Sequence, residues 1–233
     1  SSDLLFKAID DHKSTDLLSI ESKLANYSDC ILIILESPGA FTELGAFSHL
    51  DSLAKKILVI NSSEFQSEES FINQGPIKKI NKISEFKKCI YANFENFGTS
   101  INEVSKRIDK LTYQKRKQID ISSQELIEKE DKYRFYLLHD LISIMYPITH
   151  SELITLVKSI YGDLKQNVNF DLDLLTALDL IEKYKGYYLK KSSSQNLFLQ
   201  YSNFNYDLFR SGYLIRLKKT DSRLFDVSTY YGN

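Results

Sequence analysis

Two acidic side chains beside a short turn are the residues whose types and spacing best suit chemistry. Glu36 precedes the turn Ser37-Pro38-Gly39, and Glu43 follows it. Pro and Gly let the backbone turn sharply beside a bound group, and a carboxylate at such a turn is unusual unless it takes part in chemistry. We therefore take Glu43 and Glu36 as the candidate catalytic residues. For Glu36 three roles stay open: orienting Glu43, binding substrate hydroxyls, or bracing the turn.

The turn joins a predicted buried strand to a predicted helix. Residues 30–35 form an aliphatic run that stops at the turn, and a helical pattern extends over residues 41–54. Such a run predicts a parallel strand in an open α/β sheet, where ligands bind at the carboxyl ends of strands. The N-terminus of the next helix presents N–H groups and a positive dipole end to an anion. The predicted substrate-binding residues are Ser37, Pro38, Gly39 and Thr42.

Further strands and helices follow in the order of an α/β unit. An amphipathic helix over residues 16–26 leads into the first apolar run, and residues 55–61 and 88–93 are further strands. The strand–helix–strand connection should be parallel and right-handed. The polar loop 62–75 leaves the carboxyl end of its strand, so it either covers the site or is a surface connection with one anchoring Phe.

Beyond a polar junction the pattern becomes mostly helical. The predicted elements are helices over residues 132–145, 149–161 and 171–184, and a hairpin of residues 187–191 and 196–201 with a Ser-rich tip. Three helices followed by a basic hairpin outline a winged helix. The chain is therefore divided into an α/β domain of residues 1–118 and a winged-helix domain of residues 119–233.

Four lysines near the end of the third helix and on the hairpin are the predicted partner-binding residues. They are Lys183, Lys185, Lys190 and Lys191. The predicted third helix itself carries Asp171, Asp173, Asp179 and Glu182. Acids on that helix would face phosphates in a major groove, so sequence-specific DNA reading by it is disfavoured.

The turn and its helix resemble a known family. Residues 37–45 are similar to the Asp-x-Gly-Thr-x-x-Glu-(Ile/Leu)-Gly signature of nucleoside deoxyribosyltransferases, whose Glu is the nucleophile on the sugar. Residues 36–48, with Ser70-Phe71-Ile72-Asn73-Gln74-Gly75-Pro76, resemble retron-encoded effectors, which are anti-phage toxins that join such a domain to a C-terminal winged helix. The resemblance covers residues 1–118 well and the rest more loosely. It implies a Rossmann-like parallel sheet followed by a mostly helical winged-helix domain.

The resemblance also implies a strand and helix upstream of the first residues. The chain opens on Ser1-Ser2-Asp3 and an apolar run, which is typical of a capped helix start rather than of a first strand. We therefore expect the usual first strand of the sheet to be absent, and with it one wall of the site.

What the resemblance implies is a toxic effector of a retron defence system that cleaves the N-glycosidic bond of a nucleotide. Glu43 would attack or electrostatically support the anomeric carbon as the base leaves. Ser37 and Ala40 stand where the transferases carry Asp and Thr, so hydrolysis is expected in place of base exchange. Nicotinamide leaves as a neutral molecule without a general acid, which favours NAD as the substrate and nicotinamide and ADP-ribose as products.

The same resemblance implies partners. They are the retron reverse transcriptase and its RNA-linked multicopy single-stranded DNA, and the lysines above would place the protein on that complex rather than on chromosomal operators. A homo-oligomer or a filament through the complex is compatible with this. A second hypothesis is a non-catalytic adaptor that senses a nucleotide and binds DNA or protein. The retention of Glu43 within an intact turn favours the enzyme.

Composition argues against several other classes. The formal net charge is −1 over 233 residues, so nucleic-acid binding must come from a local cluster. Cys30 and Cys89 lie far apart and are interpreted as buried thiols of a cytoplasmic protein. The four His residues show no metal-ligand spacing, so we expect no metal and no cofactor, with NAD as substrate only. No apolar run approaches the roughly 20 residues that span a bilayer, so no membrane contact is expected.

Overall fold

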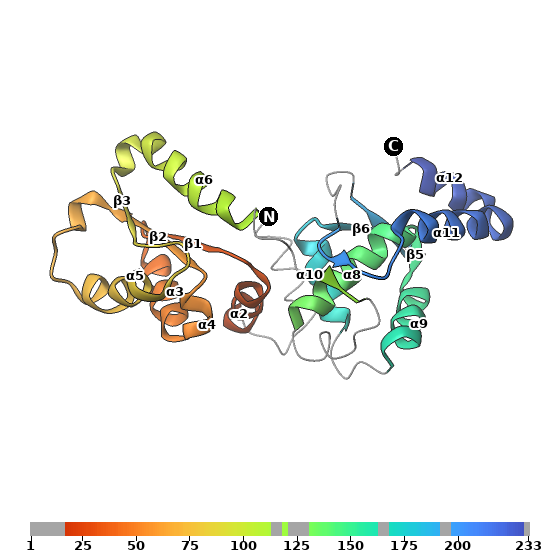
Figure 1. The fold of residues 1–233 in the computed structure, drawn as a ribbon, viewed down its shortest axis with the longest axis horizontal. Coiled ribbons are helices and arrows are strands. Elements are labelled where there is room, and N and C mark those ends of the chain that lie inside the picture. Colours follow the sequence, from red (N-terminus) through yellow and green to blue (C-terminus); the bar gives the residue numbers. More distant parts are fainter. Residues whose placement is uncertain (1–16, 113–117, 121–130, 163–167, 192–196, 231–233) are drawn as a thin grey trace. The chain divides into compact units, whose positions relative to one another are not determined.

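The computed structural model describes residues 17–112, 118–120, 131–162, 168–191 and 197–230. It is a mixed α/β structure with more helix than strand (Figure 1). Contacts divide the chain into two compact units with a boundary between Lys115 and Arg116. We call residues 17–112 the N-terminal unit and the described residues from 118 onward the C-terminal unit. None of the described helices is long and apolar enough to cross a membrane.

A three-stranded parallel sheet organises the N-terminal unit, as the sequence predicts. Its strands lie in the order β1-β2-β3, with Ile34 opposite Ile60 and Ile60 opposite Ile90. The strands are β1 (Ile31–Ile34), β2 (Ile57–Ser62) and β3 (Ile90–Ala92). Because the strands are parallel, their carboxyl ends emerge at one edge of the sheet, which we call the carboxyl edge.

Helices and short turns connect these strands. They are α2 (Leu17–Tyr27), α3 (Pro38–His49), α4 (Asp51–Ala54), η1 (Ser63–Phe65), η2 (Asn73–Ile77), α5 (Lys78–Ile83), η3 (Phe94–Asn96) and α6 (Gly98–Thr112). The predicted helix 41–54 begins earlier, at Pro38, and is divided in two at Leu50. Helix α5 is preceded directly by η2, a π-helical turn that contains Pro76.

An aliphatic core fixes α3 against the sheet. All six residues of β2 are buried, as expected for a central parallel strand covered on both faces. Leu44 and Phe47 of α3 pack in the same cluster as Val59 of β2 and Ile80 of α5. Full burial of one such side chain contributes roughly 1.5–3 kcal/mol. The turn that begins α3 is thereby held beside the carboxyl edge.

Five helices and two small sheets form the described C-terminal unit. An antiparallel sheet has the order β5-β7-β6, and a separate parallel pair joins β4 to β8. The helices are α8 (Asp131–Met145), α9 (His150–Tyr161), α10 (Val168–Ala177), α11 (Tyr206–Thr220) and α12 (Ser222–Tyr230). The strands are β4 (Gln118–Ile119), β5 (Ile148–Thr149), β6 (Ile181–Tyr184), β7 (Tyr187–Lys190) and β8 (Gln200–Tyr201). Helices α8 and α9 match the predicted bounds, and Thr149 and Glu152 form a capping box.

The structure contradicts the predicted third helix. Helix α10 ends at Ala177 rather than at residue 184, and Ile181–Tyr184 is strand β6. Lys185 and Gly186 have φ values of 48° and 85°, which suit a two-residue turn, and β6 pairs with β7 across it. The spacing of apolar residues over 171–184 is compatible with a helix. The turn at Lys185 and Gly186, however, places residues 181–184 beside residues 187–190, and these form an antiparallel strand pair instead.

The second predicted hairpin strand also pairs elsewhere. Gln200–Tyr201 lies parallel to Gln118–Ile119 and does not pair with β7. The predicted Ser-rich tip, at residues 192–196, lies outside the described residues. The hairpin of this unit is therefore β6–β7, so Lys183 and Lys185 lie on it rather than at a helix end.

A buried carboxylate links distant segments of the C-terminal unit. Asp140 of α8 accepts hydrogen bonds from the N–H groups of Phe198 and Leu199, at 2.8 and 2.9 Å. The Tyr201 hydroxyl donates to the same carboxylate at 3.0 Å, and His139 Nδ1 lies 2.9 Å from it. His139 of α8 is fully buried as well. These bonds hold the segment before β8 against α8.

Two arginines complete the buried polar framework of this unit. Arg134 donates to Asp171 at 2.6 Å, and both side chains are buried. Arg210 of α11 donates to the carbonyl oxygens of Ile144 and Tyr146, at 2.9 and 2.6 Å, and its guanidinium stacks on the Tyr146 ring at 3.9 Å. Arg210 thereby fastens α11 to the end of α8.

Candidate functional site

The turn that begins α3 is built by its own sequence. Pro38 occupies the first turn of the helix, where its missing N–H costs nothing, and Ser37 is the N-cap, with Oγ accepting a hydrogen bond from Ala40 N–H at 3.3 Å. Leu35 N–H donates to Ile60 O at 3.0 Å, which holds the chain after β1 against β2. The predicted site residues from Glu36 to Glu43 therefore lie in one stretch at the carboxyl edge.

Local hydrogen bonds occupy much of the predicted substrate-binding set. Ser37 Oγ caps the helix, and Thr42 Oγ1 donates to Pro38 O at 3.0 Å. Phe41 N–H donates to Ser37 O at 3.3 Å. Among the first-turn amides, Gly39 N–H has no hydrogen-bond partner within the described residues. The anion site expected at this helix N-terminus is thus centred on Gly39 and the helix dipole.

The two candidate catalytic carboxylates are exposed. Glu36 follows β1 and Glu43 lies on α3, next to the buried Leu44. In the part of the chain that the structure describes, no side chain is hydrogen-bonded to the Glu43 carboxylate. Both carboxylates are therefore accessible to a ligand.

A third acid, which no sequence pattern singles out, interacts with Glu43. Burial of Glu21 in α2 is the larger cause that raises the pKa of its carboxyl, and the negative charge of Glu43 adds to it. Glu21 lies one turn before Ala25, and Ala25 packs in the cluster that contains Leu44. The site therefore has an acidic character that extends from α3 to α2.

The loop after β2 is fixed at the same edge by one asparagine. Asn73 Nδ2 donates to the carbonyl oxygens of Phe65 and Glu68, at 2.7 and 2.8 Å. Tyr91, in β3, donates its hydroxyl to Asn73 Oδ1 at 3.3 Å. Helix α3 and η2 are in contact, so this loop adjoins the helix that carries Glu43. In the sequence, the run Asn73-Gln74-Gly75-Pro76 belongs to the motif that resembles retron effectors, but it does not predict these contacts.

The predicted partner-binding lysines lie in the C-terminal unit and differ in their exposure and in their ion pairing. Lys183 and Lys185 are exposed, and their ammonium groups lie 5.7 and 5.1 Å from the ring centres of Tyr188 and Tyr184. Lys190 is half-buried on β7. The last of the four lysines forms an ion pair with an aspartate: Lys191 Nζ lies 2.8 Å from Asp179 Oδ1. The exposed positive charge is therefore at the hairpin turn.

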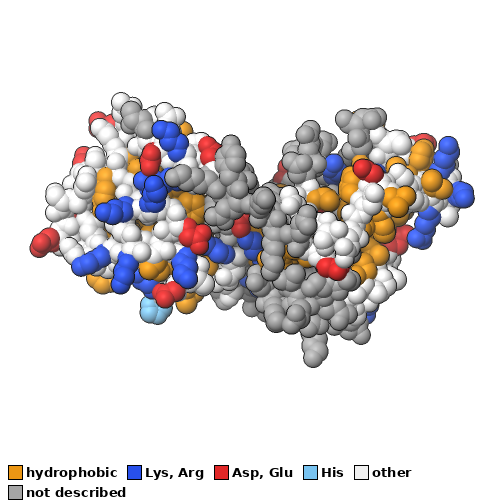
Figure 2. Space-filling view, viewed as in Figure 1, with side chains coloured by type: hydrophobic (Ala, Val, Ile, Leu, Met, Phe, Trp, Pro, Cys, Tyr) orange, Lys and Arg blue, Asp and Glu red, His pale blue; other side chains and the backbone are white. Residues whose placement is uncertain are grey.

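Other basic side chains of this unit lie on its last two helices. Figure 2 shows Lys and Arg side chains over the end of the unit where α11 and α12 lie. Exposed members of this group are Arg216, Lys218, Lys219 and Arg223. Residues 206–230 thus form a pair of helices with a basic outer surface.

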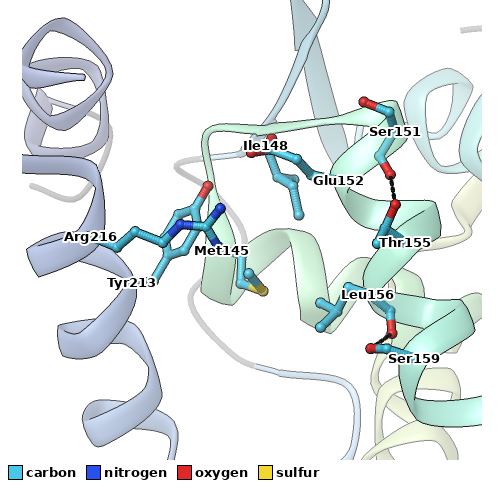
Figure 3. Close-up of a pocket in the computed structure, with 9 residues that line it drawn as sticks. All are labelled: Met145, Ile148, Ser151, Glu152, Thr155, Leu156, Ser159, Tyr213 and Arg216. Atoms are coloured by element: carbon cyan, nitrogen blue, oxygen red, sulfur yellow. Dashed lines mark hydrogen bonds between the residues drawn. The ribbon is translucent and has the colours of Figure 1, made fainter. Parts of the chain in front are cut away.

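A cleft with a volume of about 330 Å³ lies between α9 and α11 (Figure 3). Met145 and Ile148 form its floor, and Tyr213 and Arg216 face it from α11. Its polar groups are mostly engaged within their own helix or cap: Thr155 Oγ1 donates to Ser151 O at 2.8 Å, Ser159 Oγ donates to Leu156 O at 2.7 Å, and Glu152 Oε2 accepts from Thr149. Such a cleft offers apolar contact but little chemistry.

Neither thiol nor metal chemistry is supported by the described residues. Burial raises the pKa of Cys89 to about 12 and that of Cys30 to about 11, so both thiols stay protonated and unreactive. Cys30 is half-buried rather than fully buried. Among the described residues, no three His, Cys, Asp or Glu side chains gather closely enough to hold a metal ion.

Comparison with known proteins adds a family to this geometry. The model of a family described as "STM3845 retron effector protein" matches residues 2–183. An Escherichia coli protein named "Retron Ec73 putative ribosyltransferase/DNA-binding protein" is 32% identical over 215 residues, which cover 81% of this chain and 67% of that protein. Another E. coli protein, "Retron Ec86 putative ribosyltransferase/DNA-binding protein", is 47% identical over 68 residues, or 29% of this chain and 22% of that protein.

Proposed function

The chain belongs to the STM3845 retron effector protein family, and from that premise we propose that it is the toxic effector of a retron anti-phage system. Its reaction is cleavage of the N-glycosidic bond of a nucleotide, with NAD as the substrate. The observation that carries the proposal is Glu43, an exposed carboxylate fixed at the carboxyl edge of a parallel sheet. The ribosyltransferase names of the two relatives support glycosyl chemistry.

The folds of the two units support this assignment. We identify the β1-β2-β3 sheet and the turn before α3 with a nucleoside deoxyribosyltransferase-like domain. In the C-terminal unit the order α8, β5, α9, α10, β6, β7, with sheet order β5-β7-β6, is the order of a winged helix. The hairpin β6–β7 is then the wing.

In the proposed reaction, the glycosidic bond between the ribose and nicotinamide breaks and nicotinamide leaves with the bonding electrons. The positive charge of the nicotinamide ring is neutralised in that step, so no general acid is required. The Glu43 carboxylate stabilises the oxocarbenium-like carbon, directly or as a covalent ester. Water then adds to that carbon and loses a proton, which yields ADP-ribose. Gly39 N–H and the dipole of α3 are the groups available to the pyrophosphate.

The proposed control comes from the retron itself. The reverse transcriptase and its multicopy single-stranded DNA bind the effector and restrain it, and the exposed lysines at the wing, Lys183 and Lys185, contact the nucleic acid. The DNA-binding part of the relatives' names is consistent with this. Of the four acids expected on the third helix, Asp179 and Glu182 lie beyond the end of α10 and Asp171 is buried against Arg134. Only Asp173, which is half-buried, remains on that helix as an argument against major-groove reading.

Glu43→Gln tests the proposal because it keeps the size of the side chain and removes its charge. Full-length protein with its retron partners is incubated with NAD, and nicotinamide and ADP-ribose are separated by chromatography. Loss of a positioned electrostatic group costs about 10²-fold or more in rate, so the variant should be nearly inactive and non-toxic on expression. Glu85→Gln is the matched control, since Glu85 is exposed and precedes β3 at the opposite edge of the sheet. Stable NAD with the wild-type protein, or full activity of Glu43→Gln, would refute the proposal.

One observation favours the alternative of a non-catalytic nucleotide-sensing adaptor. Within the described residues nothing is hydrogen-bonded to the Glu43 carboxylate, whereas catalytic carboxylates are usually held by a neighbouring donor. The adaptor predicts that NAD binds, with a measurable dissociation constant, and is recovered unchanged. The same chromatographic assay therefore separates the two functions.

A further inference from the structure

An exposed aromatic side chain projects from the first helical residue after the β2 connection: Phe71 and Ile72 are helical and lead into η2. Phe71 has 82% of its surface exposed, which is far more than Phe65 at the end of η1, at 40%. A single exposed apolar residue needs no explanation by itself. Phe71 does require an explanation, because it lies at the carboxyl edge and its backbone is firmly held.

The backbone around Phe71 is fixed from several sides. Asn73, two residues later, bonds to the carbonyl oxygens of Phe65 and Glu68, and Tyr91 of β3 bonds to Asn73. Gln74 N–H donates to Ser70 O at 3.0 Å. A helical segment that is held in this way and presents a large apolar ring to solvent loses little conformational entropy when a ligand binds there.

The ring also has a defined position. A Cβ added to Gly75 would lie 3.6 Å from Phe71 Cζ, so the ring runs along the Gly75 backbone on one side. With most of its surface still exposed, it offers an open side to a planar ligand. A side chain larger than that of Ala at position 75 would meet this ring.

Phe71 lies at the same edge as Glu43. The connection that leads to Phe71 leaves β2 and the turn before α3 leaves β1, and these two strands are adjacent and parallel. Ile72, the next residue, packs in the cluster that also holds Ala40 and Phe41 of α3. Helix α3, which carries Glu43, is in contact with η2, which begins two residues after Phe71, so the ring and the carboxylate lie on adjoining segments at the carboxyl edge.

We propose that Phe71 is the stacking platform for the base of the nucleotide whose glycosidic bond is placed at Glu43. This deepens the proposed function and rests on it for the identity of the substrate. Every base has a flat π face, and a cationic nicotinamide ring is also attracted by the face of an aromatic ring. The residue therefore selects for a base-bearing ligand over a sugar phosphate.

A tryptophan reporter tests the stacking directly. The chain contains no Trp, so Phe71→Trp gives a protein with one tryptophan at this position. In a Glu43→Gln background, which prevents turnover, nicotinamide mononucleotide should quench its fluorescence and ribose 5-phosphate should not. Phe65→Trp, at the end of η1, is the matched control and should respond to neither compound.

Kinetics with NAD give the second test. Stacking of one base supports a loss on the order of tenfold in affinity, so Phe71→Ala should raise KM by about that factor and leave kcat within about threefold. Phe71→Tyr keeps an aromatic face and should restore KM. Both variants should keep the circular dichroism of the wild-type chain.

The outcomes separate this inference from the proposed function. Quenching by the mononucleotide alone supports Phe71 as the platform even where NAD is not hydrolysed, in which case only the proposed reaction fails. Equal responses to both compounds, or no response to either, overturn the platform. An unchanged KM in an active Phe71→Ala protein does so as well, and would assign the exposed ring to another contact.

Discussion

The two units of the molecule differ in whether they bury charged side chains. In the C-terminal unit, several charged side chains are buried and hydrogen-bonded: Asp140 accepts several hydrogen bonds, and Arg134 and Arg210 each bond to buried partners. In the described N-terminal unit, the buried polar residues are uncharged, and the acids Glu36 and Glu43 lie at the surface.

This difference indicates what each unit is built to do. A buried ionic network gains most when every member is bonded, so it specifies one arrangement of the segments that it joins. An aliphatic core instead fixes a scaffold and leaves its carboxylates to the solvent, where a ligand can reach them. The comparison predicts that changes to the exposed acids Glu36 and Glu43 affect ligands, whereas changes to the buried charges of the C-terminal unit affect stability.

The largest expected effect is that of Asp140→Ala. The substitution leaves the N–H groups of Phe198 and Leu199 and the Tyr201 hydroxyl without their acceptor, at a cost of about 3–5 kcal/mol. Hydrogen exchange followed by mass spectrometry should show faster exchange in α8 and β8 and no change in β2. Asp226→Ala, at an exposed aspartate of α12, is the control. A loss below about 1 kcal/mol would show that the carboxylate is dispensable.

The next effect concerns the buried ion pair of Arg134 and Asp171. Arg134→Met alone removes the guanidinium that bonds to the buried Asp171 carboxylate and should cost about 3 kcal/mol. Arg134→Met combined with Asp171→Leu removes both charges and should cost less than the single change. Denaturant midpoints of the two variants and the wild type, followed through α8, measure this. Additive losses would contradict an ionic coupling between the two side chains.

The strands and turns of the two units show how far the sequence predicts the structure. The apolar runs at β1, β2 and β3 and the Ser-Pro-Gly turn are local signals, and the predicted parallel sheet is confirmed. The pairing of β4 with β8 joins segments some 80 residues apart, and no local pattern encodes it. The predicted hairpin is misplaced because the turn Lys185-Gly186 follows directly on a stretch of helical spacing.

For the site, the sequence predicts which residues share the turn but not what surrounds them. Glu43 and Glu36 are contiguous with the turn, so their proximity follows from the chain itself. Glu21 and Phe71 reach the same region through packing of α2 and the loop after β2, which depends on side chains distant in sequence. The roles assigned to the turn residues stay predictions, and the local bonds of Ser37 and Thr42 reduce what those hydroxyls can offer a ligand.

A smaller effect distinguishes the two lysine pairs. Lys183→Glu with Lys185→Glu reverses exposed charges, whereas in Lys190→Glu with Lys191→Glu one charge is already paired with Asp179. Removing one lysine–phosphate interaction should lower the salt dependence of binding to the RNA–DNA partner by about 0.7–0.9 in slope. Titrations at several salt concentrations should therefore show a larger reduction for the first pair. An equal reduction of the salt-dependence slope in both double variants would show that the Lys191–Asp179 ion pair opens when the nucleic acid binds.

The smallest effect is that of Glu21→Gln, and its sign follows from the raised pKa of that carboxyl. Burial, and then the charge of Glu43, raise the pKa above its ordinary value of 4.5, so the folded chain binds the proton more tightly than the unfolded chain. At pH 7 the ionised side chain therefore destabilises the fold. The cost disappears as the pH falls through the folded pKa and is absent below 4.5.

Glu21→Gln should consequently stabilise the N-terminal unit at pH 7, by a few tenths of a kcal/mol because a partly exposed carboxylate is screened by solvent. The gain should vanish at pH 4 and should be smaller in a Glu43→Gln background, since one of its two causes is then removed. It should not vanish in that background, because burial is the larger cause. Urea midpoints of the four proteins at both pH values measure these differences. A gain that is the same at pH 4 and pH 7 would show that packing, and not the charge of the acidic site, limits stability there.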